Sequence, residues 1–201
     1  MYPRLRASVW WRAAWACVAL LCAGAGAGAG TAGAGPSSLD QLPQDWRDDL
    51  GQPLALTNLI GHRVVLSMAY SRCHHTCPAT FNELQRMQKT LDGRGEQASF
   101  VIVGYDADND DPRSWHQYRL NHGFGRANWY FLTGTPQAVR RLARELGFEF
   151  WNYDTHVMHD SRVVFFDSKG LYSGAVSPAT SDWTALLCSD STETSPCHAR
   201  H

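Results

Sequence analysis

The chain has 201 residues, of which 44% are hydrophobic and 18% charged, a composition that suits one domain with a sizeable core. Residues 1–35 contain three arginines and no acidic residue, so the rest of the chain carries 15 basic against 19 acidic residues, a net charge of −4. Because no basic patch or basic tail stands out, the composition argues against nucleic acid as a partner.

The first 35 residues predict an export segment rather than part of the domain. Arginines at the start are followed by the apolar run AAWACVALLCAG and a Gly/Ala tract, which is the order of a secretory signal peptide. The apolar run is shorter than the roughly 20 residues of a membrane-spanning helix, so an uncleaved membrane anchor is the alternative. Two cysteines lie in this segment, and the rest of the chain contains four, Cys73, Cys77, Cys188 and Cys197.

The polar stretch at residues 36–45 predicts a linker, and the domain is expected at residues 46–188. Residues 48–61 have a glycine-containing turn between short apolar runs, which predicts a hairpin. Residues 63–70, RVVLSMAY, form a nearly continuous apolar run. That run predicts a strand buried on both faces.

A cysteine loop follows this strand directly, and a helix is expected after the loop. Pro78 suits the first position of a helix, so Cys77 is predicted as its N-cap. Asp92 and Gly93 are expected to end the helix. The two cysteines of the loop would therefore lie between a buried strand and a helix N-terminus.

Strands and helices alternate along the rest of the domain. The predicted elements are a strand at 99–106, a helix from Pro112 to Gly123, a strand at 128–134, a helix from Pro136 to Gly147, a hairpin at 162–176 and a short helix at 181–187. This alternation predicts an α/β domain with a largely parallel central sheet and added hairpins. The reactive pair between strand and helix further suggests a three-layer, thioredoxin-like arrangement.

The stretch SRCHHTCPAT has three residues between Cys73 and Cys77 rather than the two that are usual between the cysteines of thiol-redox enzymes. A helix N-terminus favours the thiolate form of cysteine, and the wider loop leaves room for an ion between the sulfur atoms. Two soft thiolates suit Cu(I) well, and zinc or an iron–sulfur centre less specifically. At least one further ligand must come from elsewhere in the chain.

His159 is the candidate for this further ligand, because it lies just before the late hairpin. In a thioredoxin-like sheet, the segment that enters this strand faces the cysteine loop. Thioredoxins have a cis-proline in that segment, whereas this chain has no proline between Pro136 and Pro178. A histidine in that region turns a redox pair into a Cys–Cys–His site for Cu(I), or for Cu(II) with an added donor.

Three stretches of the chain resemble the Sco/SenC family of copper-binding cytochrome c oxidase assembly proteins. They are the strand, C-x-x-x-C-P loop and helix up to residue 88, the segment VIVGYDADNDDPRSWHQYR with Asp106, Asp110 and Pro112 in register, and WYFLTGTPQAVRRLARELG. His159 matches the distal histidine of the family, and the resemblance covers about residues 44–176. Ala107 stands where the family usually has proline.

The resemblance implies a thioredoxin-like fold and copper bound by Cys73, Cys77 and His159. It also implies a role in building the CuA centre of a respiratory oxidase, with the copper-carrying subunit of that oxidase as the partner. Another periplasmic copper protein is the alternative partner. The protein is expected in the periplasm, or anchored in the membrane and facing the periplasm.

Other interpretations stay open for these residues. Cys73 and Cys77 could form a structural disulfide or a redox-active pair without metal. His156 is expected to be a bystander, whereas His74 and His75 are expected to face solvent, and either could add a ligand to Cu(II). The two aspartates, Asp106 and Asp110, are expected to shape the loop after the second strand rather than to take part in a mechanism.

The polar tail at residues 189–201 is predicted to be mobile. Cys188 and Cys197 are expected to form a disulfide in an oxidising compartment, and a metal-collecting tail with Cys197, His198 and His201 is the alternative. Together these features predict an exported copper metallochaperone, for which enzymatic catalysis is not required. A periplasmic thiol–disulfide oxidoreductase and a copper or redox sensor are the rival functions.

Overall fold

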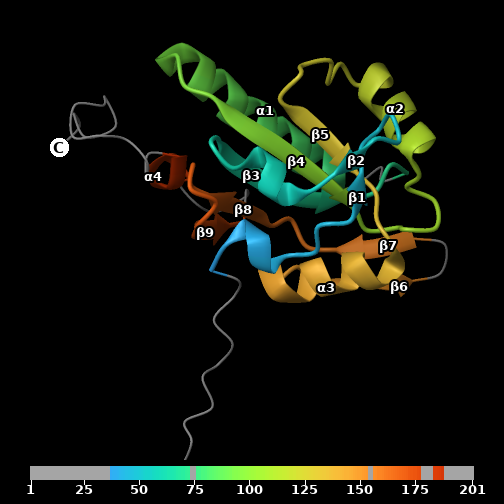
Figure 1. Ribbon diagram of the computed structural model, residues 1–201. Helices are drawn as coiled ribbons and strands as arrows, with labels where there is room; N and C mark the ends of the chain where they lie inside the picture. Colours follow the sequence, from blue (N-terminus) through green and yellow to red (C-terminus); the bar gives the residue numbers. More distant parts are fainter. Residues whose placement is uncertain (1–36, 73–75, 154–155, 178–182, 188–201) are drawn as a thin grey trace, which may run out of the picture. The chain divides into compact units, whose positions relative to one another are not determined.

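The computed structural model describes residues 37–72, 76–153, 156–177 and 183–187. Its centre is a five-stranded sheet in the order β5-β4-β3-β8-β9 (Figure 1). The strands are β3 (Arg63–Ala69), β4 (Ala98–Gly104), β5 (Trp129–Leu132), β8 (Val163–Phe166) and β9 (Tyr172–Val176). Pairs β3–β4 and β4–β5 are parallel, whereas β3–β8 and β8–β9 are antiparallel. Four of the five strands thus run in one direction, which confirms the predicted, largely parallel sheet with a late hairpin.

The helices are α1 (Thr76–Arg94), α2 (Pro112–Asn121), α3 (Pro136–Leu146) and the short α4 (Thr184–Leu187), with 3₁₀ turns η1 (Leu39–Gln41) and η2 (Leu56–Leu59). The crossovers from β3 to β4 and from β4 to β5 step in the same direction across the sheet, so right-handed connections put α1 and α2 on one face. Phe81 of α1 accordingly packs against Tyr118 of α2 and Phe131 of β5. The chain then returns towards β8 through α3, which lies away from α1 and α2 (Figure 1).

Helices α2 and α3 begin at the predicted residues, Pro112 and Pro136. The side chain of Asp111 accepts a hydrogen bond from the backbone N–H of Ser114, and that of Thr135 accepts one from Ala138. A proline follows each cap, as its fixed φ favours. Gly147 closes α3 in the left-handed conformation with a φ of 70°.

Both predicted ends of α1 are wrong by one or two residues. The helix begins at Thr76, so Cys77 lies in its first turn and is not the N-cap. At the other end, α1 continues to Arg94, and the left-handed Gly95 closes it with a φ of 67°. The N–H of Glu96 donates to the carbonyl of Leu91, which is the Schellman arrangement that stabilises this later end.

One hairpin was not predicted from the sequence: β6 (Phe150–Tyr153) pairs with β7 (His156–His159) in a separate two-stranded sheet. The bounds of the hairpin predicted at residues 48–61 are wrong, because the paired strands are β1 (Trp46–Arg47) and β2 (Pro53–Leu54) and the second half of that range forms the 3₁₀ turn η2. The aromatic alternation of Phe148 and Phe150 is the signal that could have indicated β6.

Within the described residues, no helix has both the length and the apolar character needed to cross a bilayer. The predicted signal peptide or anchor at residues 1–35 lies outside the described residues, as do Cys188, Cys197 and the tail. Those predictions therefore stay predictions.

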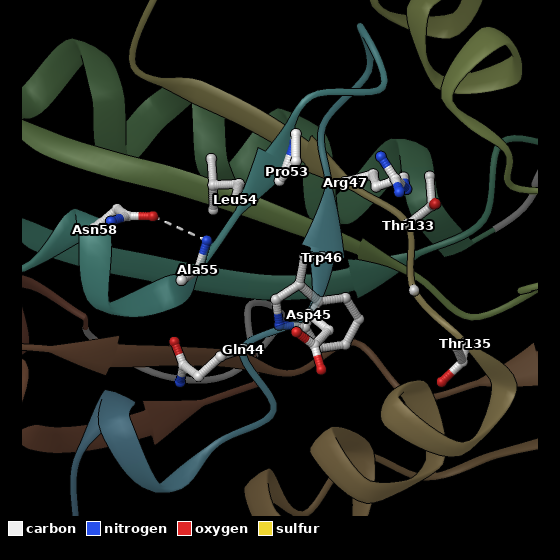
Figure 2. Close-up of a pocket in the computed structure, with 11 residues that line it drawn as sticks. Gln44, Asp45, Trp46, Arg47, Pro53, Leu54, Ala55, Asn58, Thr133 and Thr135 are labelled. Carbon is white, nitrogen blue, oxygen red and sulfur yellow. Dashed lines mark hydrogen bonds between the residues drawn. The ribbon is translucent and has the colours of Figure 1, made fainter.

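The side chain of Trp46, in the first hairpin, packs against the turn between β5 and α3 (Figure 2). Its ring covers Gly134 so closely that a Cβ there would lie 2.5 Å from Cζ3 of the indole. We expect Gly134→Ala to lower the free energy of unfolding by about 1–3 kcal/mol, because the buried tryptophan must move. Urea denaturation measures this loss, and Gly125→Ala is the matched control because a Cβ there meets nothing within 4 Å. Equal stabilities of the two variants would contradict the prediction.

Candidate metal centre

Of the three predicted ligands, the structure describes the side chain of His159 alone. Cys73 lies outside the described residues, together with His74 and His75. Cys77 is placed by its backbone in the first turn of α1, and its side chain also lies outside the described part. The predicted ligand set of Cys73, Cys77 and His159 is therefore a prediction that the described residues do not test.

His159 is the last residue of β7 and is half-buried beside the end of β3. Its ring centroid lies 5.7 Å from that of Tyr70 in a T-shaped contact and 4.9 Å from that of Tyr105 in a tilted contact. Tyr70 immediately follows β3 and stands three residues before Cys73. Because three residues span at most about 11 Å, this contact places the imidazole beside the entrance to the cysteine loop.

The hydrogen bond of the His159 ring defines its tautomer. Nδ1 lies 2.6 Å from the backbone carbonyl oxygen of Asp160, and a carbonyl only accepts, so Nδ1 carries the proton. In the neutral ring the lone pair that can bind a metal is then on Nε2. Histidine ligands in metal sites are commonly oriented by such a bond from the other ring nitrogen.

Asp160 connects the histidine to the neighbouring elements. Its backbone N–H donates to the carbonyl of Glu149 at 3.0 Å, and the hydroxyl of Tyr105 donates to its Oδ1 at 3.3 Å. Burial raises the pKa of the Asp160 carboxyl above its ordinary value, although hydrogen bonds to this carboxyl from the Glu149 backbone and the Tyr105 hydroxyl act in the opposite direction. The end of β7 is thereby held to both β6 and the end of β4.

Asp110 binds the backbone just before the cysteine loop. Its carboxylate is buried, with Oδ1 accepting from the N–H of Ser71 at 2.7 Å and Oδ2 from the N–H of Asp106 at 3.1 Å. It thus ties the residue two before Cys73 to the loop after β4. Burial raises the pKa of the Asp110 carboxyl to about 6 despite these bonds.

The predicted role of the two aspartates in shaping this loop is confirmed. Besides the contacts of Asp110, the Oδ2 atom of Asp106 accepts a hydrogen bond from the side chain of Asn109 at 2.8 Å. The sequence analysis did not predict the roles of Tyr70 and Tyr105. Their positions were available from the pattern, because each follows a parallel strand and the carboxyl ends of adjacent parallel strands meet at one edge of the sheet.

Among the described residues there is no group of three or more histidine, cysteine, aspartate or glutamate side chains that could hold a metal ion. Further ligands of a metal at His159 would therefore lie outside the described residues, and the cysteine loop is the source that the sequence predicts. One imidazole nitrogen with two thiolates is a donor set that suits Cu(I), and an added oxygen or nitrogen donor would suit Cu(II).

The sheet, the helix that starts within the C-x-x-x-C loop and the histidine at the edge of that loop define a thioredoxin-like protein with a candidate metal centre in place of the cis-proline. The sequence profile of the SCO1/SenC family matches residues 43–187. The chain belongs to this family.

Relatives and solved structures agree with this assignment. The chain is 26% identical over 135 residues to a curated Stutzerimonas stutzeri protein named for copper binding, and the match spans 64% of this chain and 65% of that protein. Copper-bound yeast Sco1 is 20% identical with a TM-score of 0.64, covering 79% of this chain and 91% of the yeast chain. BsSco, a member of the Sco family of cytochrome c oxidase assembly proteins with a disulfide switch, is 18% identical with a TM-score of 0.59, covering 77% and 84%. At these identities the two structures show a shared fold.

Proposed function

We propose that the protein is an exported copper metallochaperone that delivers copper to the CuA centre of a cytochrome c oxidase. Cys73, Cys77 and His159 hold one copper ion, and the acceptor is the copper-carrying subunit of the oxidase. The observation that carries the proposal is the placement of the His159 ring against Tyr70, at the entrance to the C-x-x-x-C loop. Membership of the SCO1/SenC family and the names of the copper-bound relatives support the choice of copper.

The local structure suits a donor that must also release its ion. Cys77 stands in the first turn of a 19-residue helix, where the helix dipole favours a thiolate. The bond from Nδ1 of His159 to the Asp160 carbonyl keeps Nε2 as the donor nitrogen. Copper then moves to the acceptor by stepwise exchange, with an acceptor thiolate replacing each donor ligand in turn.

The proposed location is the periplasm, either free or anchored by the N-terminal segment. The order of charged, apolar and small residues in 1–35 supports export. A location outside the cytoplasm also matches the acceptor, because a respiratory CuA centre is built on that side of the membrane.

The test is a transfer experiment with the full chain loaded with Cu(I) and the copper-free oxidase subunit. We expect the loaded protein to carry one copper per chain and to give it to the subunit, as followed by metal analysis of the two separated proteins. The Cys73→Ser, Cys77→Ser double variant is expected to carry none. Retention of copper by this double variant would refute the proposed ligands, and a loaded donor that transfers nothing would refute the proposed acceptor.

A thiol–disulfide oxidoreductase is the second candidate, favoured by the position of Cys77 in a helix N-terminal turn. In that reaction the two thiols would reduce an acceptor disulfide, with two electrons and two protons passing to the acceptor cysteines and a Cys73–Cys77 disulfide forming. Reduction of the oxidised oxidase subunit by copper-free protein, without any copper transfer from the loaded form, would favour this function.

A further inference from the structure

The β6–β7 hairpin has two faces of different character. Phe150 and His159 are directly opposite each other on the paired strands, and both rings pack against Tyr105. Trp151 and Met158 form the next pair, so their side chains lie on the other face of the hairpin. Both are exposed, Trp151 by 54% and Met158 by 45%.

An exposed tryptophan beside an exposed methionine is unusual for a surface that contacts only water. Tryptophan and methionine are enriched at protein interfaces, where tryptophan often contributes much of the binding energy and methionine adapts to the partner's shape. Met158 precedes His159 directly in the chain, so a partner that covers this pair contacts the chain neighbour of the candidate copper ligand.

Two arginine side chains lie beside the face of the hairpin that carries Trp151. Arg140 and Arg144 stand one turn apart on the exposed side of α3, and with Trp151 and Glu149 they line a shallow hollow between α3 and β6. Figure 1 shows α3 running beside this hairpin. Within the described part of the chain neither guanidinium has an ion-pair partner, whereas the intervening Arg141 pairs with Glu145 at 2.7 Å. Around this hollow two arginines face the single carboxylate of Glu149, while Asp106 and Asp108 line an adjoining hollow with Arg140.

We propose that Trp151, Met158, Arg140 and Arg144 form the docking surface for the copper acceptor, which presents an apolar side chain flanked by carboxylates. This inference rests on the proposed function. Copper passes only between ligands in contact, so the acceptor must reach His159, and Met158 is the chain neighbour of that residue on the other face of the same two-stranded hairpin. The two arginines complement acidic groups and guide the acceptor, while the tryptophan and methionine bury against its apolar side chain.

The experiment measures the dissociation constant of the copper-loaded full chain for the copper-free oxidase subunit. The Trp151→Ala, Met158→Ala double variant is expected to bind about ten-fold more weakly or worse, as interface tryptophans do. The Arg140→Glu, Arg144→Glu double variant is expected to bind several-fold more weakly, and added salt should weaken the wild-type complex towards the level of this variant. All variants should load with one copper, because none of these residues is a proposed ligand.

Two control variants make the same kinds of substitution, an apolar truncation and a charge reversal, at exposed positions outside the docking surface. Leu120→Ala removes a side chain of α2 that is 61% exposed, and Lys89→Glu reverses an exposed charge on α1. Both should bind the subunit like the wild type. Normal binding by the two docking-surface variants would overturn the proposal while the proposed function stands.

Three other results would also overturn it. The wild type could bind anionic lipid vesicles and the Trp151→Ala variant fail to bind them, while both bind the subunit equally. In that case the surface contacts the membrane. If sedimentation shows a wild-type dimer that Trp151→Ala converts to a monomer with unchanged subunit binding, the surface joins two copies. A loaded wild type that neither binds the subunit nor transfers copper would show that the proposed acceptor is wrong, and the docking surface would be rejected with it.

Discussion

His159→Ala is expected to weaken copper binding by about 100-fold or more while leaving thiol–disulfide exchange in place. Removing groups that merely orient metal ligands already costs about 10- to 100-fold in affinity, and this substitution removes a proposed ligand itself. The two thiols remain, so their exchange with a disulfide substrate should continue. Competition with a Cu(I) chelator measures the affinity, and reduction of an oxidised dithiol substrate measures the exchange.

The control for this substitution is His62→Ala, which removes an exposed imidazole immediately before β3, at the opposite end of the strand from Tyr70. His62→Ala should retain copper like the wild type. If His159→Ala retains copper equally well, His159 is not a ligand and the metallochaperone interpretation loses its site. If the variant loses both copper affinity and thiol exchange because less of it is folded, the effect is structural. Far-ultraviolet circular dichroism measures the folded fraction and identifies this case.

Asp110 is expected to make the protein less stable as pH rises from about 4 to about 6. Burial raises the pKa of its carboxyl from 3.8 to about 6 in the folded protein, so the folded state binds more protons than the unfolded state between these values. The free energy of unfolding contributed by this group therefore decreases through that window, by about 3 kcal/mol, and is constant above it. The direction is opposite to that of a salt-bridged aspartate.

Asp110→Asn removes this titration. Urea denaturation of wild type and variant at a series of pH values should show the stability advantage of the wild type shrinking from pH 4 towards pH 6. The N-cap residue Asp111 supplies the contrast, since the N–H of Ser114 lowers the pKa of its carboxyl and Asp111→Asn should therefore cost more stability as pH rises. A difference between wild type and Asp110→Asn that is the same at every pH would contradict the assignment.

Much of the fold could be predicted from local patterns. The apolar runs of β3 and β4 and the prolines that begin α2 and α3 each depend on residues close together in the sequence. The start of α1 was missed because a proline suits any position in the first turn, not only the first. Its end was missed because a glycine within a helix costs only about 1 kcal/mol, which the Schellman bonds after it offset.

The amino-acid sequence by itself determined the kind of site, because the spacing of Cys73 and Cys77 and the presence of a later histidine are properties of the chain. Only the tertiary structure decided that His159 packs against Tyr70, with Asp160 setting its tautomer and Asp110 holding the strand end. These contacts join residues up to 89 positions apart, and their geometry depends on sheet order and on the β6–β7 hairpin. The exposed pair Trp151 and Met158 likewise becomes one surface only through the register of that hairpin, since the two residues are adjacent in space and not in sequence.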